Sequence, residues 1–268
     1  MRIVALLEER HGIGVRGDAL PLWLEERLSV AVQALLAARK VDASALLGML
    51  TREPTLVVEL ANALRVGETR FYRDAPQWEA LRRSVMPGLW ARRPEPQRLM
   101  ALSAGCSTGE EAWTLAMLLA ESAPRVVGGT ARTRVIGVDR SEPALATARA
   151  GIYDAASHGQ LPRELAQRYL QAGVDGSARI VPDLQALVTF QCRDLSSSLP
   201  PGRYSIIVCK NVLIYFGDEA QDRLVQDLLR ALTEDGILLV ARSEIPIVRS
   251  LGAKAHEIAP NVTAFRPQ

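Results

Sequence analysis

The chain has 268 residues, of which 48% are hydrophobic, and a formal net charge of +2. This charge is too small to indicate a nucleic-acid partner, and three widely spaced cysteines with three histidines form neither a disulfide framework nor a metal-binding pattern. No apolar run approaches the roughly 18 residues of a membrane span, and charges interrupt the N-terminal segment where a signal peptide would be apolar. We therefore expect a cytoplasmic protein with a substantial core, no metal site and no membrane insertion.

The first part of the chain shows helical periodicity and no convincing strand. After an opening helix, residues 20–40 predict a long second helix with a leucine-rich stripe. A third helix covers ALLGML with Asp42 or Ser44 as its cap, and Thr55 is the candidate cap of a fourth helix that runs to about Leu64. We expect a small all-helical domain over residues 1–75.

The stretch VGETRFYRD, residues 66–74, breaks this helical pattern and combines a glycine with two aromatic residues and two arginines. Such a stretch fits a loop that faces a ligand, and it also fits a connector between domains whose aromatic side chains pack. Three prolines then indicate a linker over residues 76–97. Residues 98–268 are expected to form the ligand-binding domain.

Residues 99–117, LMALSAGCSTGEEAWTLAM, predict a strand, a turn of small residues and an apolar helix that opens with Glu110 and Glu111. This arrangement is typical of a nucleotide-like ligand site, because glycines in the turn allow positive φ and close approach of the backbone. The GxGxxG and P-loop spacings are absent, and two carboxylates at the helix start disfavour a pyrophosphate. S-adenosylmethionine, which has a positive centre, an amino group and a ribose, fits better. A ligand-free strand-to-helix connection is the alternative.

Polar side chains follow three further expected strands, and the ligands of open α/β sheets bind at the carboxyl ends of strands. Asp139 closes a strand over residues 135–138, where an acidic side chain is placed to accept hydrogen bonds from ribose hydroxyls. The other polar residues of this kind are Asp194, Lys210, Asn211 and Tyr215.

Residues 151–192 interrupt the alternation of strands and helices. A helix near 161–170 and strand-like segments near 178–181 and 187–192 indicate an inserted subdomain with a small antiparallel sheet. Such an insertion usually serves recognition of a partner or substrate. The alternative is an insertion that has no role in recognition.

The end of the chain predicts a helix over residues 219–232, a strand over residues 236–244 and a final antiparallel hairpin. This ending on a parallel sheet is typical of Rossmann-like methyltransferases. The expected fold class is therefore α/β: a Rossmann-like class I methyltransferase sheet with the helical domain before it and the β-subdomain inserted.

Four stretches, RVGETRFYRD, SAGCSTGEEAWTLAM, CKNVLIYF and VARSE, occur in an order and at separations that resemble the chemotaxis receptor glutamate methyltransferases, the CheR family. The resemblance covers nearly the whole chain. It implies S-adenosylmethionine as the methyl donor, bound over the turn, and S-adenosylhomocysteine as the product. The cofactor-binding residues that it implies are Thr69, Arg73, Ala104, Gly105, Glu111, Asp139, Asp194, Leu195, Lys210 and Asn211.

The resemblance also implies individual roles. Glu111 meets the amino end of the donor, Asp139 the ribose, and Asp194 with Leu195 the adenine side. Arg73 and Tyr215 match the positions beside the reactive methyl group and are the implied catalytic residues.

Three positions depart from the family pattern. Gly67 stands where asparagine is usual, which removes a side-chain hydrogen bond to the ligand. Lys210 replaces a common arginine, so the compact charge of an ammonium stands where a planar guanidinium could form two parallel hydrogen bonds. Asp194 replaces a common asparagine and loses an amide donor. Weaker donor affinity or a changed substrate is compatible with these departures.

The implied reaction is methyl transfer to glutamate carboxylates of a chemoreceptor, whose cytoplasmic helical domain is the expected partner of a monomeric enzyme. Because a glutamate with a pKa near ~4.3 is already ionised at pH 7, no general base is needed. Two alternatives stay open: a methyltransferase with another acceptor, and a regulator that binds the cofactor without turnover.

Overall fold

The computed structural model describes residues 2–11, 13–14, 22–64, 69–92, 99–123, 133–173 and 175–267. The chain divides into two compact units. We call residues 1–67 with 212–224 the helical unit, and residues 68–211 with 225–268 the sheet unit. Gly67 lies outside the described residues, as do residues 124–132.

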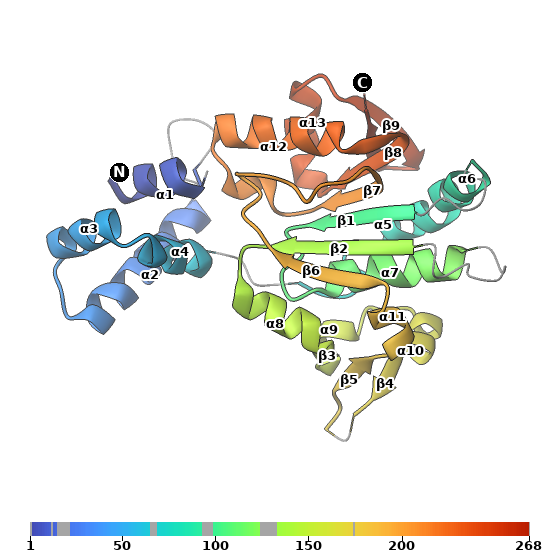
Figure 1. The fold of residues 1–268 in the computed structure, drawn as a ribbon, viewed down its shortest axis with the longest axis horizontal. Helices are drawn as coiled ribbons and strands as arrows, with labels where there is room; N and C mark the ends of the chain where they lie inside the picture. The colour runs from blue at the N-terminus through green and yellow to red at the C-terminus, as the bar shows by residue number, and fades with distance from the viewer. Residues whose placement is uncertain are drawn as a thin grey trace. The chain divides into compact units, whose positions relative to one another are not determined.

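The described residues of the helical unit form four N-terminal helices, as predicted: α1 (Arg2–His11), α2 (Leu22–Arg39), α3 (Ala43–Arg52) and α4 (Pro54–Ala63) (Figure 1). Leucines from these helices, among them Leu24, Leu46 and Leu60, form a shared buried core. Asp42 caps α3 as expected, and its carboxylate accepts a hydrogen bond from the backbone N–H of Ala45 at 2.8 Å. The prediction that Thr55 caps the fourth helix is wrong, because α4 already begins at Pro54, whose fixed φ suits a first helical position.

The later segment 212–224 packs with this helical unit. Ile13 forms an isolated antiparallel bridge with Phe216, and the backbone N–H of Gly14 donates to the carbonyl of Tyr215 at 3.1 Å. The ring of Tyr215, in the short helix η3 (Leu213–Tyr215), meets the ring of Trp23 edge to face at 5.6 Å. Tyr215 therefore belongs to the helical unit.

The sheet unit is built on seven strands in the order β6-β2-β1-β7-β8-β10-β9. They are β1 (Leu99–Ala104), β2 (Thr133–Asp139), β6 (Val188–Cys192), β7 (Tyr204–Cys209), β8 (Leu232–Val240), β9 (Lys254–Ala259) and β10 (Val262–Arg266). The strands from β6 to β8 pair in parallel, and β10 is antiparallel to both β8 and β9. All six residues of β7 are buried, as expected for a strand covered on both faces. The predicted Rossmann-like sheet with its C-terminal hairpin is confirmed.

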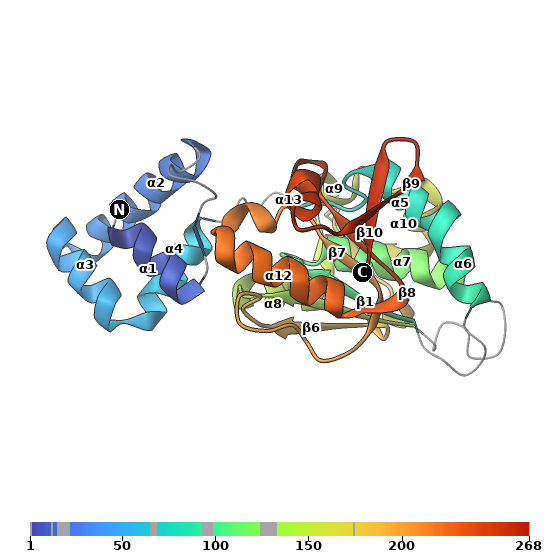
Figure 2. The same cartoon turned by 90° about the horizontal axis from the view of Figure 1, so that it is seen from above.

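Helices lie on both faces of this sheet (Figure 2). They are α5 (Ala75–Ala80), η1 (Leu81–Val85), α6 (Met86–Ala91), α7 (Glu110–Ser122), α8 (Glu142–Ala150), α12 (Asp218–Arg230), which spans the division between the units, η4 (Arg242–Glu244) and α13 (Ile245–Ser250). In α7 the residues from Ala112 to Leu119 are all buried, so this helix lies inside the core. Residues 75–91 are helical and contribute Trp78 and Leu81 to the same core. The predicted domain boundaries at residues 75 and 97 stay predictions.

The insertion contains a three-stranded antiparallel sheet in the order β3-β5-β4. Its elements are β3 (Ile152–Tyr153), α9 (Ala155–His158), α10 (Arg163–Tyr169), β4 (Leu170–Ala172), β5 (Ala178–Ile180) and α11 (Pro182–Gln185). The assignment of residues 187–192 to this small sheet is wrong, because β6 pairs in parallel with β2 and extends the main sheet. The strand predicted to run to Glu244 is also too long, since β8 ends at Val240 and η4 follows.

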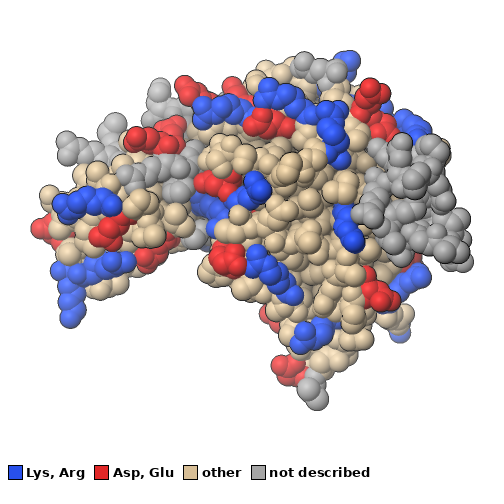
Figure 3. Space-filling model, viewed as in Figure 1, with Lys and Arg blue, Asp and Glu red and all other residues tan. Residues whose placement is uncertain are grey.

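Basic and acidic side chains are interspersed on the face shown in Figure 3. Among the described residues, no helix combines the length and apolar character needed to cross a membrane. The described part of the chain also contains no group of three or more histidine, cysteine, aspartate or glutamate side chains suited to a metal ion.

We predict that Gly109→Ala destabilises the sheet unit by about 3 kcal/mol in urea denaturation, through strain together with overpacking. Gly109 precedes α7 with φ +99°, and a Cβ there would stand 2.7 Å from the Cβ of Ala148. Gly176→Ala is the matched control, because φ is +81° but no atom lies within 4 Å. It should cost only about 1 kcal/mol. Equal losses for both variants would contradict the close approach of α8 to the turn.

Candidate active site

The turn between β1 and α7 folds onto the end of β2. Gly105 has φ +80°, and the backbone N–H groups of Gly105 and Cys106 both donate to the carbonyl of Val138 at 2.8 Å. Ala104, the last residue of β1, is fully buried. The backbone of the turn is therefore fixed against the neighbouring strand at the carboxyl edge of the sheet.

Asp139 ends β2 beside this turn and is 4% exposed. Its Oδ2 accepts from the backbone N–H of Ser107 and its Oδ1 from that of Ser141, each at 2.9 Å. These two backbone donors fix the orientation of a carboxylate that the rest of the strand end buries. A rigid acidic group at this place suits a ligand that carries hydroxyls.

The segment after β6 lies against the same strand end. The backbone N–H of Arg193 donates to the carbonyl of Asp139 at 3.0 Å, which brings Asp194 and the buried Leu195 to the edge where β2 ends. Oδ1 of Asp194 accepts from the backbone N–H of Ser196 at 2.8 Å and from its hydroxyl at 2.7 Å.

Glu111 lies in the first turn of α7, with its carboxylate at the carboxyl ends of β1 and β7. Its Oε1 accepts from the hydroxyl of Ser103 at 2.9 Å, and its Oε2 lies 3.8 Å from the ammonium nitrogen of Lys210. Burial raises the pKa of Glu111, while the charge of Lys210 and the Ser103 hydrogen bond act to lower it. Glu111 is thus a partly buried carboxylate that a further cation would favour in its ionised form.

Lys210 connects this carboxylate to the segment before α5, residues 69–74, which we call the connector. Its ammonium donates to the carbonyl of Arg73 at 3.0 Å and lies 3.6 Å from a carboxylate oxygen of Asp74. The same ammonium sits 4.5 Å from the ring centroid of Trp78, whose indole N–H also donates to the Arg73 carbonyl at 2.7 Å. With its side chain 4% exposed, Lys210 is a buried cation that fixes the backbone at Arg73.

Sequence reasoning missed two buried carboxylates, Glu110 and Glu244. Glu244 is completely buried, and its Oε2 accepts from the backbone N–H groups of Asn211 at 2.9 Å and Ala241 at 3.0 Å. It therefore joins the ends of β7 and β8 and supports Asn211 in a left-handed conformation with φ +58°. The VARSE stretch contains Glu244, but only the fold reveals its partner.

The structure therefore brings ten of the predicted residues to the sheet unit, at or beside the carboxyl edge of the sheet. These are Thr69, Arg73, Ala104, Gly105, Glu111, Asp139, Asp194, Leu195, Lys210 and Asn211. Tyr215, the remaining predicted residue, belongs to the helical unit. Their roles toward a ligand stay predictions.

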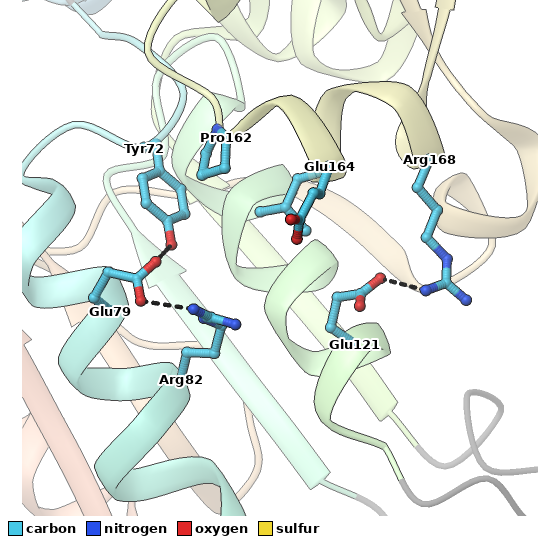
Figure 4. A pocket seen from close by; sticks show the side chains of 8 residues that line it. Tyr72, Glu79, Arg82, Glu121, Pro162, Glu164 and Arg168 are labelled. Carbon is cyan, nitrogen blue, oxygen red and sulfur yellow. Dashed lines mark hydrogen bonds and ion pairs between the residues drawn. The ribbon is translucent and has the colours of Figure 1, made fainter.

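A separate hollow of about 180 Å³ lies between the connector, α5, α7 and α10 (Figure 4). Its Glu79 accepts from the hydroxyl of Tyr72 at 2.7 Å and pairs with Arg82 at 2.8 Å, whereas Glu121 pairs with Arg168 at 2.9 Å. None of the predicted donor-binding residues lines this hollow. Its charged groups pair mainly with one another, so we do not assign the donor to it.

The chemistry of the edge around the turn fits S-adenosylmethionine. Glu111 faces Lys210, and a cation keeps its carboxylate ionised. Asp139 is a second fixed carboxylate, and it ends β2, the strand next to β1. The parallel sheet, the turn with positive φ and these acidic groups define a Rossmann-like methyltransferase that uses S-adenosylmethionine.

Comparison with known proteins narrows this class. The profile of the family described as "CheR methyltransferase, SAM binding domain" matches residues 67–250. The chain belongs to this family.

Individual relatives agree with this membership. The chemotaxis protein methyltransferase of Vibrio anguillarum is 30% identical over 89% of this chain and 86% of its own length. Chemotaxis protein methyltransferase 1 of Pseudomonas aeruginosa is 31% identical over 69% of this chain and 68% of its own. An uncharacterized 104.1 kDa protein of Rhodobacter capsulatus is 29% identical over 91% of this chain, which spans 25% of that longer protein.

Among solved structures, a TehB-like SAM-dependent methyltransferase from Corynebacterium glutamicum is 14% identical, with a TM-score of 0.39. That match covers 73% of this chain and 97% of the other.

We predict that Lys210→Met lowers the free energy of unfolding by about 3 kcal/mol at neutral pH, because Glu111 then stays buried without its cation. The loss should shrink as the pH falls. Without Lys210 the pKa of Glu111 rises further, so a proton neutralises this carboxylate in the folded variant.

Arg223→Met is the control, since Arg223 pairs at 3.9 Å with a Glu219 side chain that is 94% exposed. It should change stability by less than about 0.5 kcal/mol. Urea denaturation of both variants across pH measures the contrast, and a Lys210 variant as stable as the Arg223 variant would contradict the account.

Proposed function

We propose that the chain transfers the methyl group of S-adenosylmethionine to glutamate side-chain carboxylates of a methyl-accepting chemoreceptor and forms glutamate methyl esters. Membership of the CheR family supports this proposal. The structural observation that carries it is the convergence of Glu111, Lys210 and the Arg73 backbone beside the turn, because it joins the connector to the donor-binding edge.

In this proposal the donor lies over the turn at Ala104–Gly105. Glu111 binds its amino group, Asp139 its ribose, and Asp194 with Leu195 flank its adenine. Thr69 and Arg73 contact it from the connector, and Lys210 with Asn211 from the end of β7. The bound donor supplies an electrophilic methyl group on a sulfonium.

The chain's own residues then align the acceptor. A receptor glutamate is ionised at pH 7, because its ordinary pKa is near ~4.3, so the protein has no proton to remove. The Arg73 guanidinium orients the incoming carboxylate, and the hydroxyl of Tyr215 donates a hydrogen bond to it. Alignment of this kind contributes roughly 7 to 11 kcal/mol in well-oriented reactions.

Recognition of the acceptor is assigned to the parts outside the donor site. A receptor's cytoplasmic domain is helical, and the four N-terminal helices offer a surface against which a helix can pack. The inserted three-stranded sheet is the second candidate for docking. We further propose that the enzyme acts as a monomer in the cytoplasm, where such a receptor domain is accessible.

We predict that the purified chain transfers labelled methyl groups from S-adenosylmethionine to a receptor cytoplasmic fragment, as base-labile esters on glutamate. Arg73→Ala should lower kcat about 100-fold, because the acceptor loses its alignment. Tyr215→Phe, which loses one hydrogen bond, should lower it about fivefold.

Arg83→Ala provides the control, since this arginine is exposed and its guanidinium pairs with Glu79 at 2.9 Å. It should keep wild-type turnover. Full turnover in both the Arg73 and Tyr215 variants would refute their assigned roles. Label on another residue type or on a small molecule would point to another acceptor, and donor binding without transfer would point to a regulator.

A further inference from the structure

Glu110, the residue before Glu111, is a carboxylate buried at the centre of a hydrogen-bond network, with only 4% of its surface exposed. Its Oε2 accepts from the hydroxyl of Thr108 at 2.7 Å, and its Oε1 from that of Ser157 at 3.0 Å. The side chain of Thr69 also acts on this carboxylate to lower its pKa. The three hydroxyls come from the turn, from α9 of the insertion and from the connector.

The backbone of the connector is attached to the same network. The N–H of Phe71 donates to the carbonyl of Ser157 at 3.0 Å, and the N–H of Tyr72 donates to the hydroxyl of Thr114 at 3.2 Å. That hydroxyl in turn donates to the carbonyl of Glu110 at 2.7 Å. Two consecutive connector residues are thus held by residues that also hydrogen-bond to Glu110, Ser157 through its hydroxyl to the carboxylate and Thr114 through its hydroxyl to the backbone carbonyl.

The connector needs such support because its backbone is strained. Tyr72 and Asp74 both adopt left-handed conformations, with φ +59° and +63°. A residue other than glycine in this region costs about 1 kcal/mol or more and persists only where the surroundings fix it. The Lys210 ammonium fixes the connector at the Arg73 carbonyl, and the Glu110 network fixes it at residues 69–72.

We propose that Glu110 is a positioning residue for donor binding, which holds the connector residues Thr69 and Arg73 against the turn without contacting the donor itself. This inference rests on the proposed donor site. Two adjacent glutamates thereby have different roles. Glu111 binds S-adenosylmethionine, whereas Glu110 positions the connector that covers this ligand.

The network also defines the hydrogen-bonding capacity of Thr69. A hydroxyl has one proton to donate, and an ionised carboxylate only accepts. A Thr69 hydroxyl that donates its proton to Glu110 can act toward a ligand only as an acceptor. The cationic amino group of S-adenosylmethionine requires such a hydrogen-bond acceptor. Burial raises the pKa of Glu110, and the hydrogen bonds from Thr108, Ser157 and Thr69 act to lower it and favour the ionised form.

The first test is Glu110→Gln, which keeps the size of the side chain but places an NH₂ donor among the three hydroxyls. We expect S-adenosylhomocysteine to bind about tenfold more weakly in calorimetry, as the loss of roughly one charged hydrogen bond would do. The KM for S-adenosylmethionine should rise by the same factor, and kcat at saturating donor should stay within about threefold, because alignment is restored once the donor is bound.

The matched control is Glu121→Gln on the same helix. Glu121 accepts from the hydroxyl of Tyr169 at 2.8 Å and pairs with Arg168 at 2.9 Å, but it lies at the other end of α7. Its replacement should lower the melting temperature and leave the affinity for S-adenosylhomocysteine within about twofold. An equal loss of affinity in both variants would show a merely structural role and overturn the inference.

A double-mutant cycle with Thr69→Val tests the path through the connector. The part of the loss that passes from Glu110 through Thr69 is shared by the two variants, so the double variant should lose less affinity for S-adenosylhomocysteine than the product of the two single losses. Additive losses would overturn the inference. If Glu110→Gln does not fold, Ser157→Ala is the milder variant, and it should weaken binding about threefold; unchanged binding would overturn the inference. Wild-type chain that fails to bind S-adenosylhomocysteine would instead overturn the proposed donor site.

Discussion

The buried ammonium of Lys210 is the interaction on which the candidate site depends. It stands at the end of β7, within 4 Å of the Glu111 carboxylate in the first turn of α7, and it donates to the backbone of the connector. Two charges taken out of water are stable only when their geometry and further hydrogen bonds compensate the desolvation, and Ser103 and Trp78 supply those contacts here. One cation therefore fixes three segments that lie far apart in the sequence.

The other fixed points of the site are backbone groups held by buried carboxylates. Asp139 binds the N–H groups of the turn and of the residue before α8, and Glu244 binds those at the ends of β7 and β8. Carboxylates that accept backbone hydrogen bonds cannot easily move, so the edge of the sheet is largely preformed. Because such a site is ordered before the ligand binds, binding does not have to order the protein. The preformed edge therefore favours alignment of the methyl donor and the acceptor.

The sequence predicts the sheet, the turn and Asp139 because each has a local signal: a buried apolar run, glycines between small residues, or an acid directly after a strand. Pro87, one of the three prolines that indicated a linker, illustrates the limit of such signals, since it lies in the first turn of α6, where proline is tolerated. No local sequence signal predicts the partners of Lys210, because the Arg73 carbonyl lies 137 residues away along the chain. Glu110 and Glu111 look alike in sequence, and only the packing of α9 and the connector gives them different surroundings. Residues 187–192 carry strand character, but only pairing with β2 assigns them to the main sheet.

The most direct measurement of the central claim is a crystal structure of the chain with S-adenosylhomocysteine bound. The account predicts the amino group of the ligand within hydrogen-bond distance of Glu111, its ribose hydroxyls at Asp139, and its adenine beside Leu195. It also predicts that the Lys210 ammonium keeps its contact with the Arg73 carbonyl. A ligand bound away from the turn, or one that leaves Glu111 and Asp139 in contact with protein alone, would contradict it.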